Sequence, residues 1–257
     1  MIQGVICHSG QRKENKKTKS SLRYPALLIL TSLLAVFLTG CGDDNGLTGP
    51  GGRGNDTYDV DENGIPKFVS VDYIELENIH QISKFRSGIG HDYSDDFESC
   101  RSMKHYFQPK SSVDWSAVPI FSPVNSTVSR IFEEWAGTQV QLKSEQYPAF
   151  FFIIFHVNLT NPLNVGDVVA AGQRLGNHIG SQTMSDIAVG VNTPNGWKLI
   201  SYFDVMTDSV FQNYQARGLT SRNDVIISKE ARDGDPLTCD GEEFTDGGNL
   251  ENWIILN

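Results

Sequence analysis

One short stretch of the chain holds residue types that carry chemistry. Residues 87–96, SGIGHDYSDD, place His91 among three carboxylates, Asp92, Asp95 and Asp96. Imidazole and carboxylate groups are ligands in many zinc sites, and they also serve as general acids and bases. The stretch therefore suggests a metal site or an acid/base site, and the rest of the chain decides which groups complete it.

The elements that would position this stretch are short strands. Apolar, β-branched runs with turn residues between them are typical of antiparallel β-structure. Such runs follow residue 66 at KFVSVDYIEL, VPIFSPV, STVSRIFEEW, TQVQLKS, AFFFIIFHV, DVVAAGQRLG, DIAVGVNT and WKLISYFDVM. The Asn-Gly pair of TPNG, residues 193–196, predicts a tight hairpin between the last two runs. We expect a mostly β fold, an antiparallel β-barrel or sandwich with a few peripheral helices.

Helical material is sparse. Residues 95–107, DDFESCRSMKHYF, and residues 207–218, TDSVFQNYQARG, are the two segments expected to form helices. Thr207 is a suitable residue to cap the start of the second helix, and Gly218 is suitable to follow its end.

The N-terminal residues predict export and a lipid anchor. A basic run, residues 12–23, precedes an apolar run, residues 25–38, which is shorter than the roughly 20 residues of a membrane-spanning helix. The following LTGC resembles the lipobox of bacterial lipoproteins, so residues 1–40 are expected to be a signal peptide and Cys41 to carry the lipid. A cleaved secretory signal with an incidental Cys41 is the alternative. We expect a cell-envelope protein, facing the periplasm or the surface, with Gly42 favouring the outer membrane if the envelope is Gram-negative.

Charge and cysteine content narrow the class of protein. Without residues 1–40, the chain keeps 15 Lys and Arg (21 minus 6) against 30 Asp and Glu (31 minus 1), an acidic balance that disfavours nucleic-acid binding. Two cysteines, Cys100 and Cys239, remain beyond Cys41. In an oxidising compartment we expect them to form a disulfide; a zinc site from this pair alone is not expected, because no C-x-x-C spacing is present.

Three longer runs resemble a known family. VPIFSPVNSTVSRI, FHVNLTNPLNVGDVVAAGQRLGNHIG and DIAVGVNTPNGWKLI are similar, in collinear order over about residues 86–202, to the lysostaphin/LytM-type zinc endopeptidases that cut peptidoglycan cross-bridges. The resemblance implies the duplicated hybrid motif fold. Biotin and lipoyl carrier domains share the GD.V..GQ hairpin, but they require a modifiable lysine between their repeats, which is not found here.

The family's first metal motif, H-x-G-x-D, is degenerate in this chain. The preferred register places Gly88 at the histidine, Gly90 at the glycine and Asp92 at the aspartate, which keeps one ligand. A second register, with His91 and Asp95 as the pair, keeps both ligands but places a tyrosine at the glycine.

The family's H-x-H motif is also lost, since its positions read Asp186 and Ala188. A catalytic zinc takes three protein ligands, and neither register supplies them. His156 matches the family's other catalytic histidine. If the protein is active, His91, Asp92 and Asp186 would have to hold the zinc. A substituted site requires His91, Asp92, Asp95, His178 and Asp186 to converge at one end of the barrel, where they would otherwise line a binding groove.

The sequence thus predicts four segments: a signal peptide (1–40), a flexible Gly/Asp-rich tether (41–66), a LytM-like β domain (67–203) and a C-terminal helix-loop-strand extension (204–257). We expect a non-catalytic, metal-free domain that binds peptidoglycan or an envelope protein, such as a cell-wall hydrolase. An active zinc metallohydrolase with noncanonical ligands is the alternative, and a structural surface lipoprotein is a third reading.

Overall fold

The computed structural model describes residues 56–257. The expected signal peptide, Cys41 and the first part of the expected tether lie outside the described residues. Within residues 56–257, no helix is both long and apolar enough to span a bilayer.

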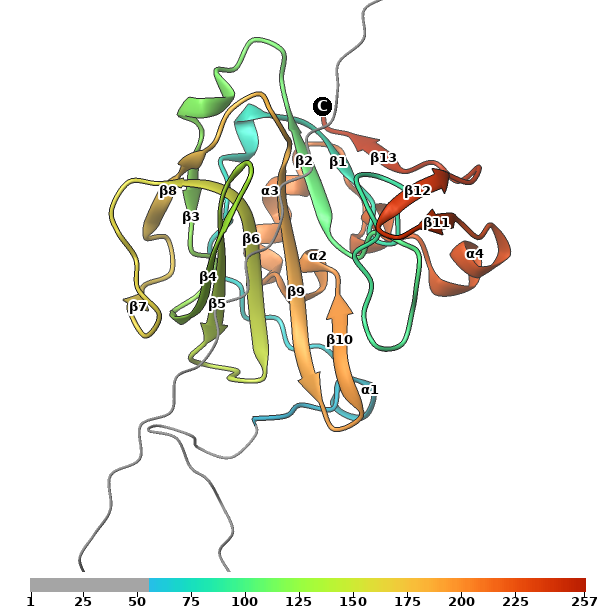
Figure 1. Ribbon diagram of the computed structural model, residues 1–257, viewed down its shortest axis with the longest axis horizontal. Helices are drawn as coiled ribbons and strands as arrows, with labels where there is room; N and C mark the ends of the chain where they lie inside the picture. Colours follow the sequence, from blue (N-terminus) through green and yellow to red (C-terminus); the bar gives the residue numbers. More distant parts are fainter. Residues whose placement is uncertain (1–55) are drawn as a thin grey trace, which may run out of the picture. The chain divides into compact units, whose positions relative to one another are not determined.

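A mostly antiparallel sheet dominates the described residues and confirms the expected fold class (Figure 1). Its path of strands is β13-β1-β2-β9-β6-β5-β4-β7, while β10 pairs with β9, and β8 pairs with both β6 and β3. The strands of this sheet are β1 (Ile79–Ser83), β2 (His105–Pro109), β3 (Pro119–Phe121), β4 (Ser126–Glu134), β5 (Gly137–Ser144), β6 (Phe150–Leu159), β7 (Val168–Val169), β8 (Arg174–His178), β9 (Ser185–Thr193), β10 (Gly196–Ile200) and β13 (Trp253–Ile255). The expected hairpin at residues 193–196 joins β9 to β10.

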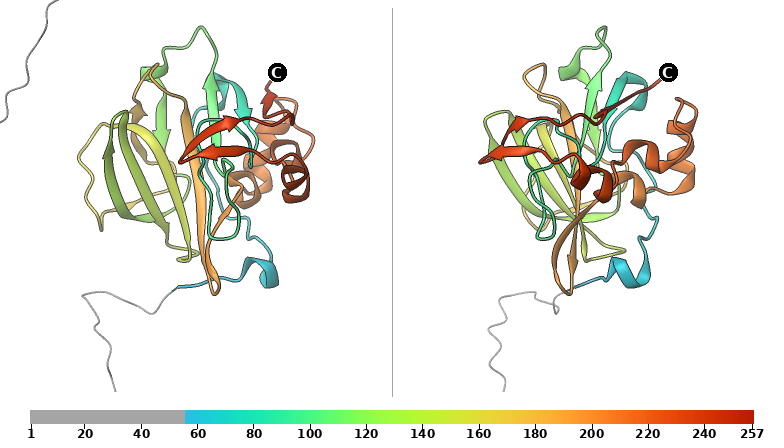
Figure 2. Two further views of the ribbon diagram at one scale, coloured as in Figure 1. Left: turned by 45° about the vertical axis from the view of Figure 1, so that its right-hand side comes forward. Right: turned by 90° about the vertical axis from the view of Figure 1, so that its right-hand side faces the viewer.

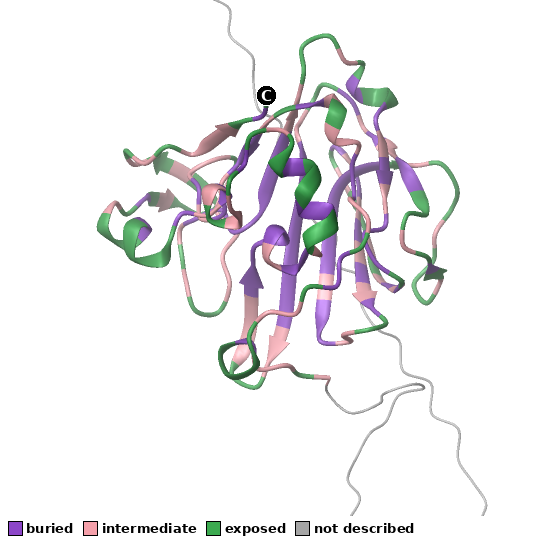
Figure 3. Ribbon diagram, turned by 180° about the vertical axis from the view of Figure 1, so that it is seen from behind, coloured by how far each residue is buried: buried purple, intermediate pink, exposed green. Residues whose placement is uncertain are grey.

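The central strands are buried on both faces. Seven successive residues of β9 and seven of the ten residues of β6 are buried, a pattern that arises when both sides of a sheet are covered. One face carries the main core, with Phe152, Ile154 and Val189. The opposite face carries a smaller apolar cluster of Phe85, Met103, Ile153, Phe155, Ala188 and Leu199. Figure 3 shows the buried central strands from behind.

The expected helix at residues 95–107 is not formed. Residues 84–104 form an irregular loop against the smaller cluster, and β2 begins at His105. Two aspartates organise this loop. The Asp92 carboxylate accepts hydrogen bonds from the backbone N–H groups of Cys100 and Arg101, and the Asp95 carboxylate accepts them from other backbone N–H groups of the loop. Cys100 also has a φ of 54°, which is incompatible with a right-handed helix. Because side chains satisfy the backbone here, the segment has an alternative to helical hydrogen bonding.

The ordered domain begins earlier than residue 67. Tyr58 packs against the Tyr147 and Phe150 rings at centroid distances of 6.1 and 5.3 Å, and Val60 is buried. Asp59 caps the short helix α1 (Val60–Asn63). Residues 58–66 therefore pack on the domain through apolar side chains such as Tyr58 and Val60. The acidic composition of this segment had instead indicated a flexible tether.

The C-terminal extension contains the remaining helices and a small hairpin. They are α2 (Tyr202–Val205), which starts just before it, α3 (Asp208–Gln215), the 3-10 turn η3 (Arg222–Val225), α4 (Lys229–Gly234) and the hairpin β11 (Thr238–Asp240) to β12 (Glu243–Asp246). Two further 3-10 turns, η1 (Leu76–Asn78) and η2 (Trp115–Ala117), lie earlier in the chain. The expected helix at 207–218 is confirmed in α3, with Thr207 before it and Gly218, at a φ of 103°, after it. Trp253 belongs to β13, which pairs with β1.

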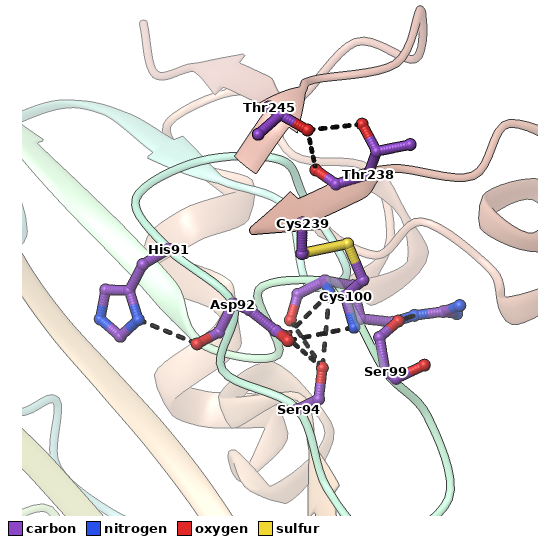
Figure 4. The surroundings of a disulfide bond; sticks show 9 residues. His91, Asp92, Ser94, Ser99, Cys100, Thr238, Cys239 and Thr245 are labelled. Atoms are coloured by element: carbon purple, nitrogen blue, oxygen red, sulfur yellow. Dashed lines mark hydrogen bonds between the residues drawn. A yellow bond between two sulfur atoms is a disulfide. The ribbon is translucent and has the colours of Figure 1, made fainter. Parts of the chain in front are cut away.

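The predicted disulfide is present. Cys100 and Cys239 are bonded, with their Cα atoms 5.8 Å apart, and Figure 4 shows the bond directly beside the Asp92 hydrogen bonds. In Figure 2 the β11–β12 hairpin lies alongside the 84–104 loop. The bond therefore fastens the C-terminal hairpin to the loop that carries His91.

Replacing both bonded cysteines, as Cys100→Ser/Cys239→Ser, should lower the free energy of unfolding by about 4 kcal/mol, because the bond closes a long loop in the unfolded chain. The bonded residues are 139 positions apart. Urea denaturation of the full chain, oxidised and reduced, measures the effect, and the reduced wild type should match the variant. Equal midpoints for the oxidised wild type and the variant would show that the bond does not stabilise the fold.

Candidate functional site

A buried ion pair lies at the centre of the face that carries the smaller apolar cluster. Lys104 Nζ is 2.6 Å from Asp186 Oδ2, and the two side chains are 1% and 0% exposed. Three aromatic rings surround the ammonium group, with centroids 4.0 Å (Phe155), 4.9 Å (Tyr93) and 5.0 Å (Tyr106) from Nζ. Aromatic faces attract a desolvated cation. The structure therefore seals a charged pair inside an aromatic enclosure.

Strand pairing positions the two partners. Lys104 immediately precedes β2, and Tyr106 of β2 is paired with Asp186 of β9. Successive side chains of a strand alternate between faces, so Lys104 and Tyr106 point to the same side, where Asp186 meets them. Gly90 lets the 84–104 loop pack directly against Tyr106, because a Cβ at its position would lie 2.0 Å from the Tyr106 hydroxyl.

His156 reaches the pair through a β-bulge. The register between β5 and β6 shifts between Thr138 and Val140, so residues 155 and 156 oppose a single residue of β5, and His156 has a positive φ of 61°. Bulges redirect side chains in this way. His156 Nε2 thereby lies 3.3 Å from Asp186 Oδ1, while Nδ1 lies 2.9 Å from the Ala136 carbonyl oxygen. Nδ1 thus lies at hydrogen-bond distance from a carbonyl oxygen, and Nε2 faces the Asp186 carboxylate.

His91 contacts the opposite side of the pair. Its Nδ1 lies 2.9 Å from the Asp92 carbonyl oxygen, to which it can only donate. Its Nε2 is therefore the free acceptor of the neutral ring, and it lies 3.2 Å from Lys104 Nζ. The side chain is 41% exposed, so His91 connects the buried ammonium to solvent.

The electrostatics favour a charged Lys104. Burial alone lowers the pKa of this amine, but the adjacent Asp186 carboxylate outweighs burial and holds the pKa above its ordinary value. Burial raises the pKa of Tyr93 to about 12, so its hydroxyl stays neutral. Burial likewise raises the pKa of Glu134, whose Oε2 lies 3.7 Å from His156 Nδ1. The site thus pairs a single lysine with Asp186 and leaves imidazoles at both ends.

These residues do not fit a zinc ion. Zinc requires three or four converging donors, yet the space between His91 Nε2 and Asp186 Oδ2 holds the Lys104 ammonium, within 3.2 and 2.6 Å of the two atoms. Within residues 56–257, no group of three or more His, Cys, Asp or Glu side chains could hold a metal. A metal could bind only after Lys104 had left its enclosure.

The structure brings together only some of the predicted site residues. His91 and Asp186 contact Lys104, and His156 contacts Asp186. The Asp92 and Asp95 carboxylates instead accept hydrogen bonds from the backbone. The Asp95 carboxylate accepts from the backbone N–H groups of Phe97, Glu98 and Leu199. A convergence of all five residues predicted for a substituted site is therefore not observed.

His178 lies at the margin of the site. Its ring is 6.5 Å from the His156 ring and packs on Trp115 at 4.4 Å, measured between centroids. Nδ1 accepts a hydrogen bond from the Gly180 N–H at 3.1 Å, and burial lowers the pKa of His178 to about 4. The ring is thus neutral and packed rather than directed at Asp186.

Lys104 is the residue that the sequence analysis missed. It lies within the expected helix at residues 95–107, whereas the structure places it directly before β2 and buries it completely. A lysine inside an apolar strand-like run is rarely buried without a partner. That signal indicates a buried anion, although it does not identify Asp186.

A pocket of about 970 Å³ opens near the ends of β2 and β9, away from the ion pair. Its lining combines apolar side chains, one of them an indole, with amide, hydroxyl and cationic groups: His80, Gln108, Pro109, Lys110, Ser111, Val113, Trp115, Ser181, Gln182, Thr183 and Met184. Trp115 links it to the site, because the same ring packs on His178. A hollow with a few convergent polar groups is the usual form of a small-ligand site.

Replacing Lys104 by Met should lower the free energy of unfolding by about 3–5 kcal/mol, since it leaves an uncompensated buried charge on Asp186. The double variant Lys104→Met/Asp186→Asn should lose less than Lys104→Met alone, because no buried charge remains. Urea denaturation measures both. Lys143→Met is the control, since Lys143 pairs with Asp56 at a more exposed site and should cost about 1 kcal/mol or less. Equal losses for Lys104→Met and the control would contradict the importance of the pair.

The sequence matches no protein-family model and no curated protein. The structure is similar to several solved structures. One is a putative glycyl-glycine endopeptidase LytM from Ruminococcus gnavus (14% identity, TM-score 0.32), where the alignment covers 40% of this chain and 43% of that one. A second is the SpoIIQ–SpoIIIAH pore-forming complex (13%, TM-score 0.39; 56% and 96%), and a third is lysostaphin (15%, TM-score 0.30; 57% and 61%). The alignment thus spans less than half of the first of these chains, and similarities of this size transfer no residue's role to this protein.

Proposed function

We propose that this protein is a non-catalytic, lipid-anchored protein of the bacterial cell envelope, and that its β domain binds peptidoglycan. The observation that carries the non-catalytic part is the Lys104–Asp186 pair, with its 2.6 Å contact and complete burial. A hydrolytic metal centre needs an ion with an open coordination position for water. Here the cation is a side-chain ammonium that cannot activate water.

The pocket at the ends of β2 and β9 supports the binding part. Peptidoglycan presents sugar hydroxyls, peptide amides and free carboxylates. Gln108 and Gln182 offer amide groups for hydrogen bonds, and Lys110 offers a cation for a stem-peptide carboxylate. The pocket does not include Lys104 or Asp186, so binding there requires neither a metal nor a catalytic group.

A pelleting assay with purified, insoluble peptidoglycan tests this function. The full chain should sediment with the polymer, release no soluble fragments and gain no hydrolytic activity from added zinc. The double variant Gln108→Ala/Lys110→Ala should bind at least about tenfold more weakly, the equivalent of about 1.4 kcal/mol. Lys143→Ala, which removes the same charge outside the pocket, should bind like the wild type.

Other outcomes separate the alternatives. Zinc-dependent release of fragments that disappears in Asp186→Ala would overturn the proposal and favour an active metallohydrolase. Failure to sediment, combined with stimulation of a purified cell-wall hydrolase, would replace peptidoglycan by a protein partner. Failure in both assays would leave a structural lipoprotein.

The anchor is tested separately, because Cys41 lies outside the described residues. In cells, the wild type should fractionate with membranes, and Cys41→Ser should move to the soluble envelope fraction, since two or more acyl chains are needed for stable attachment. Metabolic labelling with a fatty acid should mark only the wild type. Membrane association of Cys41→Ser equal to the wild type would exclude the lipid anchor.

A further inference from the structure

Lys104 and Asp186 are in close contact, but they do not form the hydrogen bond that an ion pair at this distance usually has. Nζ lies 2.6 Å from Oδ2, but among residues 56–257 neither carboxylate oxygen has an aligned hydrogen-bond donor. Buried polar groups nearly always have such donors. Lys104 Nζ thus lies close to the Asp186 carboxyl group, but its N–H groups do not have the angles of a hydrogen bond to either oxygen.

A histidine stands at each end of the pair. His91 Nε2, the free acceptor of its ring, is 3.2 Å from Lys104 Nζ, where it can take a proton from the ammonium. His156 Nε2 is 3.3 Å from Asp186 Oδ1, where it can give a proton to the carboxylate. A base on the nucleophile and an acid on the oxygen that must leave are the two groups that amide formation requires.

The surroundings favour condensation over hydrolysis. Phe155, Tyr93 and Tyr106 enclose Nζ, and both partners are inaccessible to solvent. Holding two reacting groups in contact replaces a bimolecular encounter by a unimolecular step, and the exclusion of bulk water disfavours the reverse reaction.

We propose that Lys104 and Asp186 form an intramolecular isopeptide bond, which joins the start of β2 to β9. His91 removes one proton from the Lys104 ammonium, and the amine nitrogen attacks Asp186 Cγ while His156 protonates Oδ1. The Cγ–Oδ1 bond then breaks, and Oδ1 leaves as water with one proton from His156 and one from the amine nitrogen. His91 releases its proton to solvent and His156 regains one. Overall, one ammonium and one carboxylate become one amide and one water, with no oxidant or other co-reactant.

The bond would have a structural consequence at the same site. It would close the chain from residue 104 to residue 186 and would fix the lysine permanently where it excludes a metal. This inference does not rest on the proposed function, because an uncrosslinked ion pair excludes the metal equally. Loss of the isopeptide proposal therefore leaves the peptidoglycan proposal standing, and the two experiments have different readouts.

Peptide mapping of the full chain tests the bond. After reduction of the disulfide and digestion with trypsin, cleavage at Lys104 should be blocked, because trypsin does not cut at an acylated lysine. Mass spectrometry should find a branched peptide that joins residues 102–110 to residues 175–198, lighter than the two separate peptides by one water molecule. Lys143 and Asp56, which pair at 2.9 Å near solvent, serve as the internal control and should remain unlinked.

Variants assign the roles. Lys104→Arg keeps the positive charge and should abolish the branched peptide, while Lys143→Arg should leave it unchanged. His91→Ala and His156→Gln should each slow its appearance in newly made protein by about 100-fold, the lower end of the usual contribution of a general acid or base. The digest of the wild-type protein tests the bond even if a variant fails to fold, because separate peptides with normal cleavage at Lys104 would overturn the proposal. Unaltered rates of bond formation in both histidine variants would overturn the acid–base route.

Discussion

A charged lysine placed inside a β domain must be neutralised by an equally buried partner, and the rest of the site follows from this constraint. Moving one charge out of water costs several kcal/mol, and attraction between partners offsets this only in close contact. The Lys104–Asp186 contact of 2.6 Å provides that compensation, and the faces of three aromatic rings add to it. The same atoms that stabilise the pair also remove Asp186 from the set of available metal ligands.

Strand pairing, a β-bulge and a loop held by a disulfide together bury the Lys104–Asp186 pair. The pairing of β2 with β9 brings Lys104 to Asp186, and the bulge in β6 brings both Phe155 and His156 to the same point. The 84–104 loop covers the pair, organised by Asp92 and fastened by the Cys100–Cys239 bond. Two features distant in sequence, a bulge and a disulfide, therefore control one buried contact. The pocket beside Trp115 includes neither Lys104 nor Asp186, so a ligand could enter it without disturbing the pair.

Sequence patterns predicted the fold better than the site. Alternating and β-branched runs were sufficient for the strands, Asn-Gly for the β9–β10 hairpin, and two cysteines in a chain that we expect to be exported for the disulfide. They failed at the 84–104 loop, because the Asp92 and Asp95 carboxylates accept hydrogen bonds from the backbone N–H groups there, which local propensity does not reveal. They also failed at Lys104, since burial of a lysine depends on Asp186, which is distant in the sequence. The resemblance to the family's motifs pointed to His156 and Asp186, but only the bulge and the strand pairing show that His156 contacts Asp186 and that Asp186 pairs with an ammonium group.

The most direct test of the central claim is a crystal structure of the protein grown with excess zinc, with anomalous diffraction recorded at the zinc edge. The account predicts that Lys104 Nζ remains against Asp186, as an ion pair or as an amide, and that no anomalous peak lies within bonding distance of Asp186. A zinc peak bound by Asp186 together with His91 or His156, with Lys104 displaced from its aromatic enclosure, would contradict it and would restore a metal centre to this site.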